Sequence, residues 1–476
     1  MPQSPSNQKR QNPIRERVEA EIFTDREEEL AFLLEWTGYV AGKHEKSIAL
    51  VSPRRYGKTA LLERLYNHIF WERNDVIPFY YELGRDEMWL MDFIEDYYLS
   101  FLRQFMAYRL RDATIAFNKK IEAEQIYQLA VDAGEKEIQQ SLESLPKLRK
   151  SGDHAFLDAA RTSPHWYASM TGFSVIVMFD EFQRLDEVLY YDQERTRKCH
   201  PYTGGFASVA ESRWAPMLIA GSQVTMLTRQ ALGGAMAGRV GSVYLDLMSL
   251  DAGAELARKL ARQQGIDLPL ELSYTIARLT RGHPYYIWCL FHSRKRDRDL
   301  STAEGIGVVL TFEVENTSGR INEFWRDHFL QNMAAVNEVN AKRMILYLLR
   351  REGEETPVDD IVEQLDLTIS KEEANRKLRE LVWGDLIKEI GSSVYGGLSD
   401  PMLERVLRIE YSWELENLRR SETVTQVGQE ITAGVLAAEK EMVAHLRGQL
   451  NDLVGREAEI FVERVMRRRF EGQEVE

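Results

Sequence analysis

Cysteine is almost absent from this chain of 476 residues, which contains only Cys199 and Cys289. Two cysteines cannot build a disulfide framework or a cysteine-rich zinc site, and this usage fits a protein of the reducing cytoplasm. No apolar run approaches the roughly 20 residues that a membrane helix needs, so we expect no membrane contact. The first residues also lack the apolar core of a secretory signal, and their polar, basic composition predicts disorder over residues 1–20.

Basic residues are in the minority, since 61 Lys and Arg stand against 75 Asp and Glu and give a net charge of −14. Proteins that coat nucleic acids bind by neutralising many phosphates with basic side chains. The charge balance therefore excludes that class and leaves room only for a local nucleic-acid contact. With 44% hydrophobic and 29% charged residues, the composition is typical of a globular protein, and the length predicts about three domains.

Short apolar runs, rich in β-branched and aromatic residues, alternate with helical stretches in the first half of the chain. They cover Ser47–Val51, Val76–Leu83, Ser174–Phe179, Pro216–Ala220 and Val243–Leu247. The alternation predicts an α/β fold with a parallel sheet, and the continuous apolar runs predict strands that are buried on both faces. Any one run can also be a piece of buried helix, but five at this spacing favour strands.

The remaining sequence is helical in character. Residues 91–170 are charged and aromatic, which predicts a helical insertion with a charged helix that is broken at Pro146. Three short helices and a hairpin follow later, in the order of a winged helix-turn-helix. The predicted parts are an α/β core over residues 21–250, a helical lid over 251–335, a winged helix over 340–400 and a helical C-terminal region over 401–476.

A strand, a tight loop and a helix follow one another in SIALVSPRRYGKTALLERL. In this order the N–H groups of the loop and of the helix N-terminus point at phosphates, which the helix dipole also favours. Gly57 would let the backbone approach closely, Lys58 would bridge the β- and γ-phosphates, and the Thr59 hydroxyl would bind Mg²⁺. The alternative is a surface loop with a chance GKT. The predicted nucleotide-binding set is Ser52, Pro53, Arg54, Arg55, Tyr56, Gly57, Lys58, Thr59 and Ala60.

The first residue of this loop departs from the usual pattern. The strict motif has glycine where this chain has Ser52. A serine can make the same turn if its φ angle stays negative, although it has less conformational freedom than glycine. The departure therefore leaves the prediction of a phosphate-binding loop standing.

A second apolar strand, in FSVIVMFDEFQRL, ends in two adjacent carboxylates. A buried strand places Asp180 at the carboxyl edge of the sheet, where open α/β folds bind ligands. Asp180 would hold Mg²⁺, directly or through water, and Glu181 would be the general base for an attacking water. Alone, such a pair is usually a solvated loop start. Combined with the phosphate loop, it predicts the second half of one Mg-ATP site, with the two motifs at the ends of adjacent strands.

Six segments then occur in a characteristic order: FTDREEEL, SPRRYGKTALL, VMFDEFQRL, LIAGSQVTML, AGRVGSVYLDLMSL and LTRGHPYYI. Together they resemble the archaeal-type ATPases, relatives of the STAND and AAA+ proteins within the ASCE type of P-loop NTPases. The resemblance covers Phe23 to about Leu290 and extends more weakly through the predicted winged helix. It implies an ATPase that binds ATP and Mg²⁺.

The resemblance implies roles for residues near the nucleotide. Arg26 in FTDREEEL would belong to the segment that packs near the adenine. Pro284 in RGHPYYI would lie against the base as part of the lid, although the GHP sequence also serves to break a helix. Arg54 and Arg55 would add positive charge near the phosphates or pair with surface acids.

Two further segments of the resemblance concern the γ-phosphate. Ser222 or Gln223 in LIAGSQ would lie near the γ-phosphate and the attacking water. Arg239 in AGRVGS would reach a γ-phosphate, in its own or a neighbouring subunit, or would only form a salt bridge. We therefore count Glu181, Lys58, Arg239 and Gln223 as the candidate catalytic residues.

The predicted winged helix is acidic, with nine Lys or Arg against thirteen Asp or Glu in residues 341–400. A winged helix that binds duplex DNA usually has a basic recognition face. The basic residues of its third helix, Lys371, Arg376, Lys377 and Arg379, would contact phosphates or form part of a mixed-charge exterior. We expect protein docking or self-association through the winged helix and the C-terminal helices rather than DNA binding.

The C-terminal segment LNDLVGREAEIFVERVMRRRF resembles the helix that opens a PD-(D/E)xK nuclease-like domain. No strand follows it in this sequence to supply the remaining carboxylate and lysine, so we expect no complete nuclease site, and Glu457 and Glu459 as helix-surface charges. The sequence thus favours an ATP-dependent switch with Mg-dependent hydrolysis. A non-hydrolysing, ATP-stabilised scaffold or a DNA-associated regulator stays open as the alternative.

Overall fold

The computed structural model describes residues 11–199, 202–221, 234, 236–336 and 338–470. Its contacts divide the chain into two compact units, the first built mainly on residues 25–246 and the second on most of the chain from residue 247 onward. Within the described ranges no helix is both long enough and apolar enough to cross a membrane.

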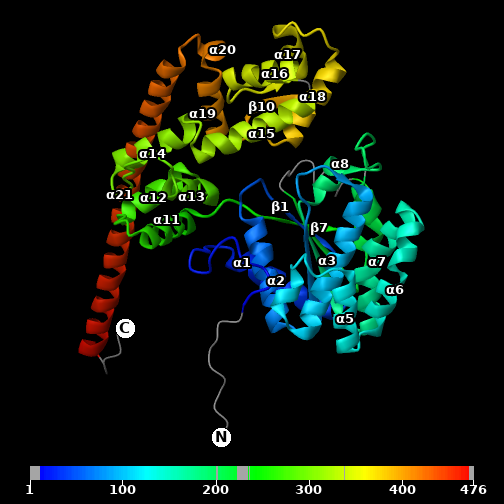
Figure 1. The fold of residues 1–476 in the computed structure, drawn as a ribbon. Helices are drawn as coiled ribbons and strands as arrows, with labels where there is room; N and C mark the ends of the chain where they lie inside the picture. The colour runs from blue at the N-terminus through cyan, green and yellow to red at the C-terminus, as the bar shows by residue number, and fades with distance from the viewer. Residues whose placement is uncertain (1–10, 200–201, 222–233, 235, 337, 471–476) are drawn as a thin grey trace. The chain divides into compact units, whose positions relative to one another are not determined.

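A parallel sheet forms the centre of the first unit (Figure 1). Its strands are β1 (Ile48–Val51), β2 (Val76–Glu82), β4 (Ser174–Asp180), β6 (Met217–Gly221) and β7 (Gly241–Tyr244), in the order β2-β4-β6-β1-β7. The strands β1, β4 and β6 are buried along their whole length. All neighbouring strands run parallel, so their carboxyl ends meet at one edge. The predicted α/β fold is confirmed.

Two details of the sheet differ from the prediction. The strand β7 begins at Gly241 rather than Val243 and is largely exposed instead of buried on both faces. It is an edge strand, which pairs only with β1. The strands that carry the two motifs, β1 and β4, are also not adjacent, because β6 pairs with both and lies between them. The motifs are therefore two strand spacings apart, roughly 10 Å.

Helices cover both faces of this sheet. They are α1 (Glu27–Ala41), α2 (Lys58–Glu72), α3 (Leu90–Leu110), α4 (Ala113–Ala116), α5 (Ala123–Ala133), α6 (Lys136–Lys150) and α7 (Asp153–Thr171). Figure 1 shows α1 and α2 on one side and α3 with α5 to α7 on the other. Because α3 packs on β2 and α7 on β4, the predicted helical insertion supplies a layer of the core.

The predicted break at Pro146 is wrong, since α6 continues through this residue to Lys150. A proline inside a helix loses one backbone hydrogen bond and crowds the preceding turn. Here the apolar side chains of Leu142 and Leu145 are buried on the same helix. This burial supports the helix on the N-terminal side of the proline and offsets the lost bond.

Short elements complete the first unit. They are β3 (Met88–Trp89), which pairs with β5 (Leu189–Tyr190), together with η1 (Phe182–Arg184), α8 (Leu185–Val188), η2 (Thr203–Phe206) and α9 (Ala207–Ala210). The outer edge of β2 is covered by α3, where the Gln104 amide accepts from Tyr80 N at 2.8 Å and donates to Tyr80 O at 2.9 Å. An exposed strand edge is thereby capped by a side chain.

Residues 11–20 are ordered, contrary to the prediction of disorder there, and the rest of that prediction, over residues 1–10, lies outside the described residues. Ile14 is buried, and its backbone exchanges two hydrogen bonds with the Asn67 side chain of α2, at 3.1 and 3.0 Å. Glu16 adds an ion pair with Arg64 at 2.8 Å. The segment has no apolar periodicity of its own, and its partners lie about 50 residues away, which is why local sequence patterns did not reveal it.

The second unit is largely helical. Its first helices are α11 (Leu250–Gln264), α12 (Leu270–Leu279), α13 (Pro284–Phe291), α14 (Ala303–Glu315) and α15 (Arg320–Val336). Next come α16 (Glu338–Arg350), β8 (Thr356–Pro357), α17 (Val358–Gln364), α18 (Lys371–Trp383), β9 (Ile387–Gly391) and β10 (Val394–Leu398), with the sheet order β8-β10-β9. Three helices and a hairpin occur as expected; their identity as a winged helix stays a prediction.

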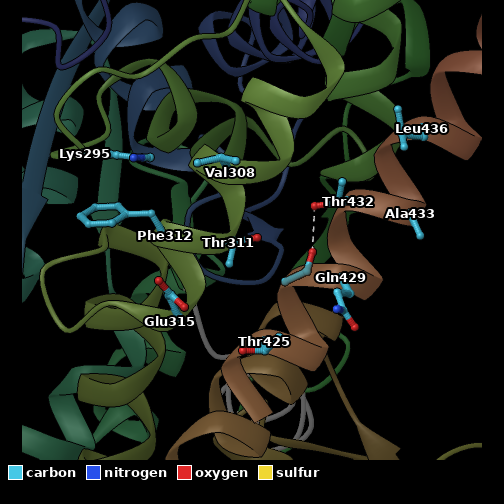
Figure 2. A pocket seen from close by; sticks show the side chains of 11 residues that line it. Lys295, Val308, Thr311, Phe312, Glu315, Thr425, Gln429, Thr432, Ala433 and Leu436 are labelled. Atoms are coloured by element: carbon cyan, nitrogen blue, oxygen red, sulfur yellow. Dashed lines mark hydrogen bonds between the residues drawn. The ribbon is translucent and has the colours of Figure 1, made fainter. Parts of the chain in front are cut away.

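The C-terminal helices pack back on the earlier helices of the second unit. They are α19 (Pro401–Glu410), α20 (Ser412–Glu416) and α21 (Arg420–Phe470), and α21 lies along α12, α14 and α19. Small residues allow close approach, since Cβ atoms added at Gly307 and Gly428 would lie 3.2 Å from Thr432 and Thr311. Figure 2 shows the groove of about 610 Å³ beside this crossing, lined by Val308 and Phe312 of α14 and by Leu436 of α21, among others.

A tight turn joins α12 to α13. Gly282 has a φ of +69°, in the left-handed region, and Pro284 is the first residue of α13. A Cβ atom at Gly282 would lie 2.1 Å from the carbonyl oxygen of Met248. Only glycine fits this position, because both the backbone conformation and the close approach exclude a side chain.

We expect Gly282→Ala to lower the free energy of unfolding by about 3 kcal/mol or more, because a steric clash adds to the backbone strain. Gly265 is a matched control, since its φ of +67° is similar but no heavy atom lies within 4 Å of an added Cβ. Gly265→Ala should cost only about 1 kcal/mol. Urea unfolding of both variants measures the difference, and equal midpoints would contradict the explanation.

Candidate functional site

The phosphate loop lies between β1 and α2, at the carboxyl edge of the sheet. Gly57 immediately precedes α2 and has a φ of +97°, the left-handed region that favours glycine. A Cβ atom there would meet no heavy atom within 4 Å, so the backbone faces open space. Ser52 is not among the residues with positive φ. The expectation that serine can make this turn with a negative φ is therefore confirmed.

The Lys58 side chain folds back over the start of the loop. Its Nζ donates to Ser52 O at 2.6 Å, to Ser52 Oγ at 3.0 Å and to Pro53 O at 2.8 Å. The lysine is only 5% exposed, and none of these acceptors is a carboxylate. Burial lowers the pKa of Lys58 to about 8, while the charges of Glu181 and Asp180 act in the opposite direction. A buried ammonium held by neutral acceptors favours an anionic ligand.

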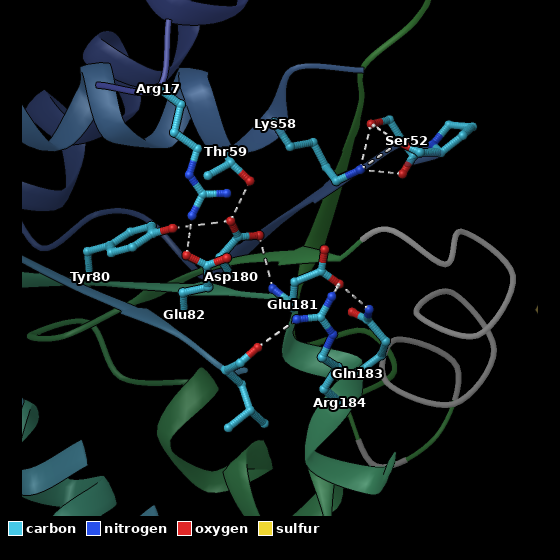
Figure 3. Close-up of polar contacts among 12 residues, drawn as sticks. Arg17, Ser52, Lys58, Thr59, Tyr80, Glu82, Asp180, Glu181, Gln183 and Arg184 are labelled. Carbon is cyan, nitrogen blue, oxygen red and sulfur yellow. Dashed lines mark hydrogen bonds and ion pairs between the residues drawn. The ribbon is translucent and has the colours of Figure 1, made fainter. Parts of the chain in front are cut away.

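The two motifs meet directly despite the intervening strand. Thr59 Oγ1 donates to Asp180 Oδ2 at 2.7 Å, and Tyr80 OH donates to the same oxygen at 3.3 Å (Figure 3). Asp180 is 1% exposed. Burial raises the pKa of Asp180, as does the neighbouring Glu181, whereas the Thr59 hydrogen bond lowers it. The predicted metal pair is therefore assembled around one carboxylate oxygen.

Glu181 follows Asp180 in a left-handed conformation, with φ at +56°. This turn directs its carboxylate toward the residues of η1. Gln183 Nε2 donates to Glu181 Oε2 at 2.6 Å, and Arg184 Nη2 lies 3.4 Å from the same oxygen. Arg184 also donates to Leu83 O at 2.8 Å, which anchors it to the end of β2. The two donors hold Glu181 next to Asp180 and Lys58.

Sequence reasoning missed a second group of charges at this edge. Glu82 ends β2 and is the register partner of Asp180. Arg17, from the N-terminal segment, pairs with Glu82 and with Glu63 of α2, whose Oε1 lies 3.0 Å from Arg17 Nε. Burial raises the pKa of Glu63 to about 7, against the lowering effect of its bond to the Arg17 N–H. The position of Glu82 at the end of a predicted strand could have pointed to it. No feature of the sequence around Arg17 pointed to the site.

The other predicted arginines of the first unit, Arg26, Arg54 and Arg55, differ in their burial and contacts. Arg26 is buried, and its Nη2 donates to Asp246 O at 2.5 Å and to Tyr56 O at 3.4 Å. This guanidinium ties the loop backbone to the chain after β7. Burial lowers the pKa of Arg54, which the charge of Glu181 raises. Arg55, in contrast, is exposed and has a φ of +67°.

Arg239 lies at the opposite edge of the sheet from the loop. It comes just before β7, whose first residue, Gly241, is the register partner of Ile48 at the start of β1. One strand length, roughly 13 Å, therefore separates it from the carboxyl edge. There it forms a salt bridge of 3.4 Å with Glu211 and donates to Ala207 O at 3.2 Å. Contact with a phosphate in its own chain does not fit this placement, and the salt-bridge alternative describes its contacts.

The remaining predicted residues are Ser222, Gln223 and Pro284. Ser222 and Gln223 lie outside the described residues. Pro284 belongs to the second unit, where it starts α13 next to His283, whose ring stacks on Tyr286 at 3.9 Å. The helix-breaking role of GHP is thus visible in the turn between α12 and α13.

The basic residues of α18 are less available than the sequence suggested. Lys377 is buried, and its ammonium donates to Val336 O at 2.8 Å. Lys371 pairs with Asp359 at 3.0 Å. A buried lysine that serves a backbone carbonyl cannot contact a DNA phosphate. The phosphate-contact alternative therefore does not fit Lys377, and the ion pair of Lys371 fits the mixed-charge alternative.

The chemistry of these groups fits Mg²⁺ and a triphosphate. Hydroxyl and carboxylate oxygens are the ligands that Mg²⁺ prefers, and it usually keeps several waters and phosphate oxygens besides one or two protein ligands. The pair of Thr59 and Asp180 meets that need, and within the described residues no group of three or more His, Cys, Asp or Glu forms a separate cage. The buried Lys58 and the open backbone at Gly57 suit the phosphates.

No family model matches the sequence, and no curated protein matches it. Among solved structures, the Walker-type ATPase PABY2304 of Pyrococcus abyssi is similar, with 19% identity, a TM-score of 0.51 and coverage of 83% of this chain and 99% of that one. The Aeropyrum pernix ORC1 protein, solved in complex with DNA, has 13% identity and a TM-score of 0.40, covering 84% and 95%. The ORC2 protein of the same organism, in its ADP form, has 11% identity and a TM-score of 0.41. This match covers 88% of this chain and 97% of that one.

At these TM-scores the two Aeropyrum structures are too distant to support a conclusion. The likeness to the Pyrococcus ATPase extends over nearly the whole of that protein. At 19% identity it establishes the fold and nothing beyond it. The chain therefore shares the α/β fold of this Walker-type ATPase.

Proposed function

We propose that this protein binds ATP with Mg²⁺ and hydrolyses it to ADP and phosphate. The observation that carries the proposal is the meeting of two motifs 121 residues apart, through the bond from Thr59 to Asp180, beside a buried lysine. A structural loop would have no reason to bury an ammonium without a carboxylate in contact with it. A triphosphate supplies the missing negative charge.

The residues have separate tasks in this scheme. The Lys58 ammonium exchanges its carbonyl acceptors for phosphate oxygens, and the N–H groups from Gly57 onward donate to the same ligand at the start of α2. Thr59 and Asp180 hold Mg²⁺, which neutralises charge that develops on the phosphates. Glu181, held by Gln183 and Arg184, accepts a proton from the attacking water. Arg26 keeps the loop in place through its bond to Tyr56 O.

The same scheme makes the protein a nucleotide-dependent switch. Loops that the γ-phosphate and Mg²⁺ hold in place can rearrange after hydrolysis. We propose that the second unit passes this change to a protein partner or to another copy of the chain. The buried Lys377 and the paired Lys371 of α18 support docking to protein over DNA.

Two substitutions test the assignment. Lys58→Ala should weaken ATP binding by roughly 100-fold or more, because a charge-assisted contact to the phosphates is lost. Glu181→Gln keeps the shape of the side chain and should retain ATP binding, while hydrolysis falls by about two orders of magnitude or more. Titration with a fluorescent ATP analogue measures binding, and phosphate release measures turnover.

The two readouts also distinguish the proposed ATPase from the alternative functions. Undiminished hydrolysis in both variants would refute the assignment. A wild-type protein that binds Mg-ATP but releases no phosphate, with or without duplex DNA, would instead favour a non-hydrolysing scaffold. DNA binding that weakens with salt in the absence of turnover would favour the regulator.

The pKa of about 8 for Lys58 predicts a pH dependence of ATP binding in the presence of EDTA. The ammonium is mostly charged at neutral pH, and bound phosphate raises its pKa further, so binding takes up a proton above pH 8. The dissociation constant should rise as pH increases through 8, approaching about tenfold per pH unit. Lys58→Arg is the control, because a guanidinium does not titrate in this range. A flat wild-type profile between about pH 7 and 9.5 contradicts the prediction.

A further inference from the structure

The described N-terminal segment crosses α2 and ends at the acidic edge of the site. Ile14 and Asn67 exchange hydrogen bonds, Glu16 pairs with Arg64, and Arg17 reaches Glu63 and Glu82. We refer to residues 12–17 as the strap. Because α2 begins with Lys58 and Thr59, the strap lies on the same helix that starts the nucleotide site.

The strap delivers one positive charge to a cluster of carboxylates. The backbone N–H of Arg17 donates to Glu63 Oε2 at 2.8 Å, and its guanidinium contacts Glu63 and Glu82. Figure 3 shows the guanidinium directed toward Glu82, beside Thr59 and Asp180. Glu82 and Asp180 are register partners on neighbouring strands, so their backbones are roughly 5 Å apart. The charge of Arg17 is therefore placed where the proposed metal pair lies.

A positive charge this close to Thr59 and Asp180 disfavours the binding of a second cation there. The Arg17 side chain is 53% exposed, so solvent screens its interactions, but Glu63 beside it is 4% exposed. Removing Arg17 would leave Glu82 free to add negative charge near Asp180. The local potential would then favour a divalent cation more strongly than it does with the strap in place.

We propose that Arg17 is a positioning residue that acts as a resident cation at the metal edge, so that docking of the strap and binding of a divalent cation oppose each other. This inference rests on the proposed function, since it concerns the same Thr59 and Asp180 pair. It assigns to the strap the regulation of metal binding at the site. By linkage, if the docked strap weakens the binding of the metal ion, the bound metal ion weakens the docking of the strap by the same factor.

The test uses Mn²⁺, whose binding to the full chain is followed by electron paramagnetic resonance with and without ATP. Arg17→Gln should lower the Mn²⁺ concentration at half-saturation by about fivefold to tenfold. Arg17→Lys keeps the charge and should stay close to wild type. Arg15→Gln is the matched control, because it removes the same charge from an exposed residue of the same strap and should change half-saturation less than about twofold.

A second route releases the strap without changing its charge. Asn67→Ala removes both bonds to Ile14 and should shift Mn²⁺ binding in the same direction as Arg17→Gln. Trypsin should then cut after Arg15 or Arg17 faster in this variant. In the wild-type protein the rate of these cuts should rise with Mn²⁺.

The outcomes distinguish this inference from the proposed function. If the Mn²⁺ concentration at half-saturation in Arg17→Gln equals or exceeds the wild-type value, the inference is overturned, even if Mg-ATP binds normally. An Arg15→Gln effect as large as that of Arg17→Gln also overturns it, because the effect would then be nonspecific charge. A protein whose Mn²⁺ binding depends on Arg17 but which binds no ATP overturns the ATPase assignment, while the metal-binding part of the proposed function, on which the inference rests, is retained.

Discussion

The hydrogen bond from Thr59 to Asp180 is the contact on which the site depends. It joins residues that are 121 positions apart, at 2.7 Å: Thr59 in the first turn of α2, which follows β1, and Asp180 at the end of β4, a strand that does not pair with β1. Such a meeting requires that both strands end at the same edge of the sheet. A parallel arrangement guarantees this, and α2 brings Thr59 across the width of β6 to reach Asp180. The fold thus has one direct chemical consequence, a hydroxyl and a carboxylate placed together.

Burial of charge is the second theme of the site. Lys58 and Asp180 are both nearly inaccessible, and neither forms a direct ion pair with the other in the contacts described above. Desolvation of this kind costs free energy unless hydrogen bonds or ligands compensate. Ser52 contributes its hydroxyl to that compensation, which gives the unusual first residue of the loop a physical role. Glu181 is held by Gln183 and Arg184 in the same way.

Much of the fold could be predicted because backbone periodicity is local. The runs at β1, β2, β4 and β6 carry apolar and β-branched side chains, and each became a strand within one or two residues of its predicted bounds. Prediction failed where neighbours decide the outcome. The exposure of β7 follows from its place at the sheet edge, and the continuity of α6 through Pro146 accompanies burial of Leu142 and Leu145. Neither the exposure of β7 nor the continuity of α6 could be predicted from the local sequence pattern.

The candidate site divides in the same way. The identities of Gly57, Lys58, Thr59 and Asp180 could be read from the sequence alone, because phosphate and metal chemistry demand particular residue types at fixed spacing after a strand. Only the tertiary structure placed Arg17 and Glu82 beside them and Arg239 at the far edge. Those placements depend on strand order and on docking between distant segments, and a sequence pattern records the chemistry of a side chain but not which remote partner the folded chain brings to it.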